Sequence, residues 1–138
     1  MQRAEIVSHL RSLGEERLRA GSYPEAVHTF HLFECDRCEG NHFRVRLERH
    51  PGDEPGDFRG LLHLECSRCR AGKVGLGVTS GTPAPEEVRT EHPSCPCGSD
   101  EFALGLSERY EDWGFFDEGT VVALCASCHL AQALVDTD

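Results

Sequence analysis

The sequence lacks any long apolar run. No stretch approaches the roughly 20 apolar residues of a membrane-spanning helix, and the charged start MQRAEIVSHLRSLGEERLRAG has no apolar segment of the kind found in signal peptides. These absences argue against a membrane partner and predict a soluble, cytoplasmic protein. Because thiols stay reduced in that compartment, cysteines there are expected to bind metal rather than form disulfides.

The sequence is also poor in apolar residues and in lysine. Its hydrophobic fraction is 38%, and 14 glycines and 7 prolines add many turns. This composition argues against a large aliphatic core, so the chain is expected to need cross-links that hold its fold. Lysine occurs once, as Lys73, and no basic cluster accompanies it.

Eight cysteines, by contrast, are arranged in close pairs. The pairs are Cys35 with Cys38, Cys66 with Cys69, Cys95 with Cys97, and Cys125 with Cys128. A spacer of 27 residues separates the first two pairs, and an equal spacer separates the last two. Phe43 and Phe102 each follow the first pair of a unit by five residues, and Gly60 and Gly119 each precede a short apolar run. The matched spacing predicts an internal duplication.

Each unit is predicted to form a β-hairpin between its two cysteine pairs. In the first unit FRVRL alternates apolar and polar residues, LLHLE is the returning strand, and KVGLGV adds a third strand. The turn-rich stretch PGDEPGD joins the first two. In the second unit FALGLSERY and TVVAL are the expected strands. Two residues between cysteines form a tight turn that aims both sulfurs at one ion, and the hairpin brings the second pair beside the first.

This arrangement resembles the zinc-ribbon family over residues 33–78 and 92–135. The resemblance implies a small metal-stapled α+β fold, with an N-terminal helical hairpin followed by two tandem antiparallel ribbons. The expected division is a helical hairpin at 1–32, ribbon one at 33–78, a linker at 79–91 and ribbon two at 92–138. It also implies two structural zinc ions, each held by four cysteines. The ligand sets are Cys35, Cys38, Cys66 and Cys69 for the first ion, and Cys95, Cys97, Cys125 and Cys128 for the second.

Two features leave the second site and the metal open. The pair at Cys95 and Cys97 is one residue short, and His92 precedes Cys95 at the usual spacing, so His92 is an alternative ligand to Cys97. Four cysteines also hold iron in rubredoxin-like sites, so zinc and iron both remain candidates.

The motif Cys125-Ala-Ser-Cys128-His129 also matches the attachment site of a c-type haem. Its position argues against haem, because the pair occupies the place that Cys66 and Cys69 hold in unit one, where Arg70 follows instead of histidine. We expect His129 to be a neighbour of the metal site, with a role as spare ligand left open.

The stretch LGEERLRAGSYPEAVHTF resembles a single tetratricopeptide repeat. The matching residues are Leu13, Gly14, Gly21, Tyr23, Ala26 and Phe30. The resemblance implies a helical hairpin whose second helix begins at Pro24, and a short helix near 23–28 followed by a strand is expected. The apolar stripe of the first helix is predicted to pack on the first ribbon, with a partner contact as the alternative.

Charge argues against nucleic acid as the main partner. Residues 79–138 carry two arginines and twelve acidic residues, and the whole chain carries a net charge of −10. Arg44, Arg46 and Arg49 in unit one are candidate phosphate contacts, but the favoured interpretation is a solvated strand face balanced by acids.

The loop YEDWGFFDEG suggests a protein contact. It places Trp113, Phe115 and Phe116 among acidic residues, and such aromatics are frequent at interface hot spots. The alternative is that they cover the metal site or the gap between units. No catalytic motif occurs, and four cysteines fill the coordination of a zinc ion, so an enzyme is not expected. The preferred function is a zinc-binding adaptor for an unidentified protein partner. The alternatives are a nucleic-acid-associated ribbon and a redox protein with cysteine-held iron.

Overall fold

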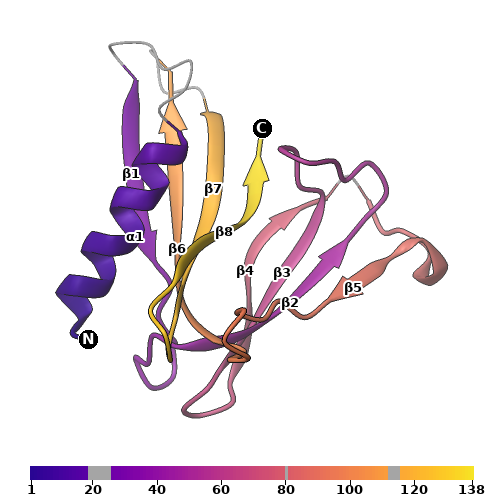
Figure 1. Cartoon of the computed structure of the whole chain (residues 1–138). Helices are drawn as coiled ribbons and strands as arrows, with labels where there is room; N and C mark the ends of the chain where they lie inside the picture. Colours follow the sequence, from indigo (N-terminus) through magenta and orange to yellow (C-terminus); the bar gives the residue numbers. More distant parts are fainter. Residues whose placement is uncertain (19–25, 80, 112–115) are drawn as a thin grey trace.

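The computed structural model describes residues 1–18, 26–79, 81–111 and 116–138, and this part of the chain is mostly antiparallel sheet with one N-terminal helix (Figure 1). The elements are α1 (Arg3–Arg17), β1 (Val27–Leu32), β2 (Phe43–Arg49), β3 (Gly60–Cys66), β4 (Gly72–Val78), the short 3₁₀ helix η1 (Pro85–Glu87), β5 (Arg89–Glu91), β6 (Glu101–Tyr110), β7 (Phe116–Cys125) and β8 (Ala131–Thr137). No helix in these ranges is long and apolar enough to cross a membrane.

The sheet consists of two three-stranded groups joined by a short pairing. Its order is β4-β3-β2-β6-β7-β8, and the two groups meet where β2 pairs with β6, through Phe43 opposite Phe102 and Arg44 opposite Glu101. Beyond this point the groups diverge (Figure 1), while β5 pairs with β2 and β1 pairs with β6. The predicted hairpins and the third strand of unit one are present, and the strands β5 and β8 were not expected from the sequence.

The expected tetratricopeptide-like hairpin is wrong. Residues 19–25 lie outside the described part. The strand expected after the helix is present as Val27–Leu32 and pairs with β6 along its whole length, so the helix does not reach residue 28. Phe30, which matches the tetratricopeptide pattern, instead packs on Gly105, where an added Cβ would lie 2.4 Å from its ring. β-Branched and aromatic residues favour a strand when a sheet edge is available, and β6 supplies that edge.

The two hairpins have the same register. Phe43 lies opposite Cys66 in the first, and Phe102 lies opposite Cys125 in the second. A register shift also occurs at matching places, between Leu62 and His63 in the first group and between Val121 and Val122 in the second. Each unit therefore contains three strands that share an irregularity at the same distance from the third cysteine, and the second unit has a further shift between Arg109 and Tyr110.

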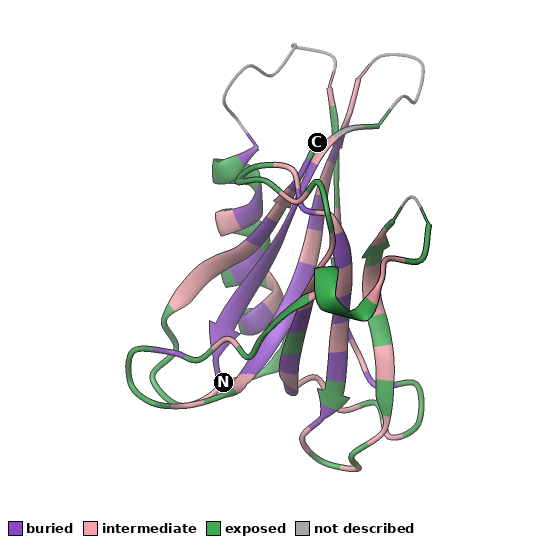
Figure 2. Ribbon diagram, turned by 90° about the vertical axis from the view of Figure 1, so that its right-hand side faces the viewer, coloured by how far each residue is buried: buried purple, intermediate pink, exposed green. Residues whose placement is uncertain are grey.

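The core lies between the two groups of strands and extends across both units. One cluster of buried side chains includes Phe43, Leu64, Phe102 and Val121, with Phe58 from the loop before β3. The backbone N–H of Phe58 donates to the carbonyl of Asp136 at 2.9 Å, which ties this loop to β8. In Figure 2 the central strands carry most of the buried residues.

Helix α1 packs on the second unit, not on the first ribbon as predicted. Ile6 and Leu10 form a second buried cluster with Val122 and Leu124 of β7. The second half of β7, from Val121 to Cys125, is thus covered on both faces, which explains why it is continuously apolar rather than alternating. The helix stripe contacts this unit because the β1 pairing places the N-terminal segment alongside β6.

Candidate metal centres

The first cluster lies at the knuckles that follow β1 and β3. The Sγ atoms of Cys35 and Cys69 are 3.5 Å apart, as are those of Cys38 and Cys66. All four sulfurs lie within 4.8 Å of one another. The structure therefore brings together the four cysteines predicted for the first ion.

Each knuckle of this cluster is closed by backbone hydrogen bonds. The N–H of Glu39 donates to the carbonyl of Cys35, and the N–H of Arg70 donates to the carbonyl of Cys66, both at 2.9 Å. These turns require positive φ at the residue after the second cysteine, 63° at Glu39 and 68° at Arg70. Glycine adopts this conformation most easily, so the turns here are indicated by the cysteine spacing and not by a glycine at this position.

Backbone amides also point at the sulfurs of the first cluster. The N–H of Arg37 donates to Cys35 Sγ, and that of Gly40 donates to Cys38 Sγ, each at 3.4 Å. The backbone N–H groups of Cys38 and Arg37 hold the pKa of Cys35 at about 6. This lowering of the pKa favours the thiolate, the form that binds metal.

The second cluster is built the same way with a shorter first knuckle. The Sγ atoms of Cys95 and Cys128 are 3.4 Å apart, and those of Cys97 and Cys125 are 3.6 Å apart. With one residue fewer, the turn closes through the N–H of Gly98 to the carbonyl of Cys95 at 2.8 Å. The tighter turn still brings Cys97 to the other three sulfurs.

Neither histidine near the second cluster belongs to it. Among the residues that the structure describes, the ligand group is made of cysteines alone, and His92 is exposed. His129 is also exposed and has φ of 61°, with its N–H donating to the carbonyl of Cys125 at 3.1 Å. His129 thus fills the same knuckle position as Arg70 in unit one.

The surroundings of Cys125 in the second cluster also favour its thiolate form. Burial raises the pKa of Cys125, but the backbone N–H groups of Cys128 and Ser127 outweigh it and bring the pKa to about 6. The N–H of Ser127 lies 3.4 Å from Cys125 Sγ. The two clusters differ in exposure, because Cys38 and Cys69 are half-buried whereas Cys97 and Cys128 are exposed.

The sulfur geometry fits a tetrahedral ion and not a disulfide. A tetrahedron with metal–sulfur bonds of about 2.3 Å has sulfur–sulfur edges of about 3.8 Å. The short edges of 3.4 to 3.6 Å in both clusters are close to this value. A disulfide needs sulfurs about 2.05 Å apart, and all eight cysteines are free. Each set can therefore hold one metal ion with all four positions filled by thiolates.

A row of buried residues connects the two clusters across the sheet. Cys66, Phe43, Phe102 and Cys125 are successive partners on β3, β2, β6 and β7. With strands about 4.8 Å apart, the Cα atoms at the ends of this row are on the order of 14 Å apart. All four residues belong to one buried cluster, so the two centres share a core.

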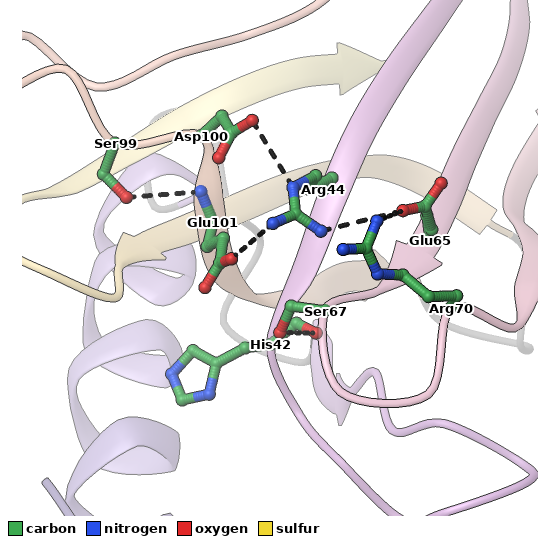
Figure 3. Close-up of polar contacts among 8 residues, drawn as sticks. All are labelled: His42, Arg44, Glu65, Ser67, Arg70, Ser99, Asp100 and Glu101. Carbon is green, nitrogen blue, oxygen red and sulfur yellow. Dashed lines mark hydrogen bonds and ion pairs between the residues drawn. The ribbon is translucent and has the colours of Figure 1, made fainter.

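Arg44, a predicted phosphate contact, lies among carboxylates at the junction of the units (Figure 3). Its Nη2 donates to Glu101 at 2.8 Å, its Nε lies 3.5 Å from Asp100, and its Nη1 lies 3.7 Å from Glu65. Glu101 is also the backbone partner of Arg44 in the β2–β6 pairing. Most of the N–H groups of Arg44 are thus directed at carboxylates of the junction between the units.

The other two arginines predicted as phosphate contacts differ from each other. Arg49 pairs with Asp53 and Glu91, each at 3.1 Å, and its guanidinium lies over the ring of Phe58. Arg46 is exposed on β2. The three arginines therefore do not form the continuous, unpaired strip that a phosphate backbone would favour.

The aromatic loop is described only in part. Trp113 and Phe115 lie outside the described residues. Phe116, predicted to lie in the loop, is instead the first residue of β7. It is 44% exposed, and its ring meets Tyr110 edge-on at 5.9 Å between centroids. Its exposure leaves it available for a contact with another molecule.

The two four-cysteine clusters indicate a small metal-binding protein with an α+β fold. Comparison of the chain with protein-family models, with curated proteins and with solved structures gives no match.

Proposed function

We propose that each four-cysteine cluster holds one structural zinc ion in a ribbon-like module. The observation that carries this proposal is the closed set of four sulfurs within 4.8 Å in each unit. Zinc accepts four thiolates in a tetrahedron and has no redox chemistry.

We also propose that the two units arose by internal duplication. Their hairpins pair Phe43 with Cys66 and Phe102 with Cys125, and their third strands join with a shift at matching positions. This agreement extends the equal cysteine spacers of the sequence into backbone pairing. A duplicated ribbon with one ion per copy accounts for both features.

Natively purified protein is expected to contain two zinc ions per chain and to be colourless. The reason is that both clusters offer four sulfurs and no open position. Elemental analysis by plasma mass spectrometry, combined with an absorption spectrum, measures both. A content of one metal per chain, or iron with a visible absorption band, would contradict the proposal and favour the redox alternative.

We further propose that the protein acts as an adaptor that contacts another protein. A metal with all four positions filled offers no site for substrate, so the zinc would shape a surface rather than catalyse. The segment at residues 111–118 is the preferred surface, because Phe116 at the start of β7 is exposed and lies among acidic residues in the sequence. Nucleic acid is the weaker alternative, since Arg44 and Arg49 already pair with carboxylates.

Replacing Trp113 and Phe116 with Ala together is expected to weaken partner binding more than folding. Truncating an interface hot spot costs about 2 kcal/mol or more of binding free energy, or about thirtyfold in affinity. Retention of cellular proteins on the immobilised protein and the melting temperature are measured together. The control is Leu130→Ala, which removes another exposed apolar side chain outside this loop. A large drop in melting temperature with unchanged retention would show that the loop is structural.

A further inference from the structure

A cavity of about 490 Å³ lies on the face of strands β2, β3 and β4 opposite the shared core. Its lining comes from several separate segments: Arg44 and Arg46 of β2, His63 of β3, Arg70 of the second knuckle, and Val74 of β4. The pattern of β2 places Arg44 and Arg46 on one face, with Phe43, Val45 and Leu47 buried on the other. The sequence indicated the arginines through this alternation, but not the cavity, because Arg70 and His63 come from distant segments.

The cavity is positively charged in a strongly acidic protein. Arg46 is exposed, and the side chain of Arg70 is 71% exposed with its Nη1 3.5 Å from Glu65. Glu65 also lies 3.7 Å from Arg44 Nη1, so this one acid lies between two arginines of the cavity lining (Figure 3). Because the chain as a whole carries −10, this concentration of cations points to an anionic ligand.

Two buried nitrogens at the cavity lack a hydrogen bond among the described residues. They are Arg44 Nη1 and His63 Nε2. The nearest carboxylate oxygens, of Glu65 and Glu48, lie 3.7 and 3.4 Å away without hydrogen-bond geometry. A buried polar atom without a partner is costly, and oxygen atoms of a ligand in this cavity would satisfy both.

We propose that this cavity binds a small phosphomonoester. Its dianion presents three oxygens and two charges, which match the donors of Arg46 and Arg70 and the two unsatisfied nitrogens better than a monocarboxylate does. Val74 is 51% exposed at the same cavity and offers an apolar surface to the organic part of the ligand. The cavity volume suits a molecule of the size of a nucleoside monophosphate.

A nucleic acid chain fits this place less well than a small ligand. Residues 79–138 carry two arginines against twelve acids, and a bound chain longer than the cavity would extend along this acidic unit. Asp100 and Glu101 lie beside Arg44, at the edge nearest unit two. Favourable contacts between protein cations and phosphate therefore end where the cavity ends, which favours one phosphate group over a polymer.

The test is a titration of the metal-loaded, ¹⁵N-labelled protein with adenosine 5′-monophosphate, followed by amide chemical shifts. Saturable shifts are expected at Arg46, His63, Arg70 and Val74. Arg46→Gln and Arg70→Gln are each expected to lower affinity by about tenfold, because each removes a charge-assisted hydrogen bond. Arg68→Gln is the matched control, since Arg68 is exposed on the same knuckle but does not line the cavity. It is expected to change affinity less than twofold.

Separate ligands identify which part of the probe is bound. Adenosine should give no saturable shifts, and inorganic phosphate should shift the same amides with weaker affinity. Absence of shifts with the monophosphate, or equal losses of affinity in the Arg46, Arg70 and Arg68 variants, would overturn the proposal. Tighter binding of an eight-nucleotide single strand with a steep salt dependence would overturn it in favour of a nucleic-acid surface.

Discussion

Removing the metal with a strong chelator is expected to unfold both groups of strands. Structural zinc in small domains contributes on the order of 10 kcal/mol of apparent free energy. Whole domains of this size are stable by about 5–15 kcal/mol, so loss of two ions exceeds what the remaining contacts supply. Without metal, each cluster also leaves two pairs of sulfurs only 3.4 to 3.6 Å apart, with the pKa of Cys35 and of Cys125 lowered to about 6.

Circular dichroism and amide spectra during chelation measure this unfolding. The control is the same chelator saturated with zinc beforehand, which should leave the spectrum unchanged. Restoring zinc under reducing conditions should recover the signal, because the eight cysteines are free thiols rather than disulfides. Unchanged strand signal after complete metal loss would show that the shared apolar core is sufficient, and the ions would then have another role.

The cysteine pattern could be predicted from the sequence because it is local. A knuckle needs two cysteines a few residues apart, and a hairpin needs alternating strands beside it, so both features are visible in a short window. The same reasoning located β2, β3, β4, β6 and β7. The short knuckle at Cys95 and Cys97 followed from the equal spacers, which kept Cys97 in register and made His92 the weaker ligand.

The joining of the two units was not visible in any local window. Phe43 and Phe102 are opposite each other on paired strands of different units. Strand β1 precedes unit one in the sequence but pairs with β6 of unit two. The low apolar content, which argued against a large core, was misleading for the same reason. Each unit has few apolar residues, but both contribute them to one cluster between the strand groups. The tetratricopeptide prediction was wrong because a single repeat has no neighbouring repeat to pack against. Val27–Leu32 pairs with the edge of β6 instead.

This shared core leads to the second large effect. Replacing Cys125 and Cys128 with Ser together is expected to remove metal from the second cluster and also to weaken metal binding at the first. Loss of unit two would expose side chains such as Phe43 and Leu64, each of which is now only 1% exposed. Each buried side chain of this kind contributes about 1.5–3 kcal/mol, so two of them correspond to at least about a hundredfold loss of affinity at the first cluster.

Competition with a colorimetric zinc chelator measures the affinity of the remaining site. Ser127→Ala is the matched control, because Ser127 is exposed in the same knuckle and its backbone N–H bond to Cys125 Sγ is kept. Two independent ribbons would behave differently: the variant would keep one ion at unchanged affinity, and the amides of β2, β3 and β4 would keep their chemical shifts. The row from Cys66 through Phe43 and Phe102 to Cys125 instead makes each centre depend on the packing of the other. Loss of affinity at the intact first cluster, with all four of its cysteines present, is the result that separates a shared core from two ribbons in series.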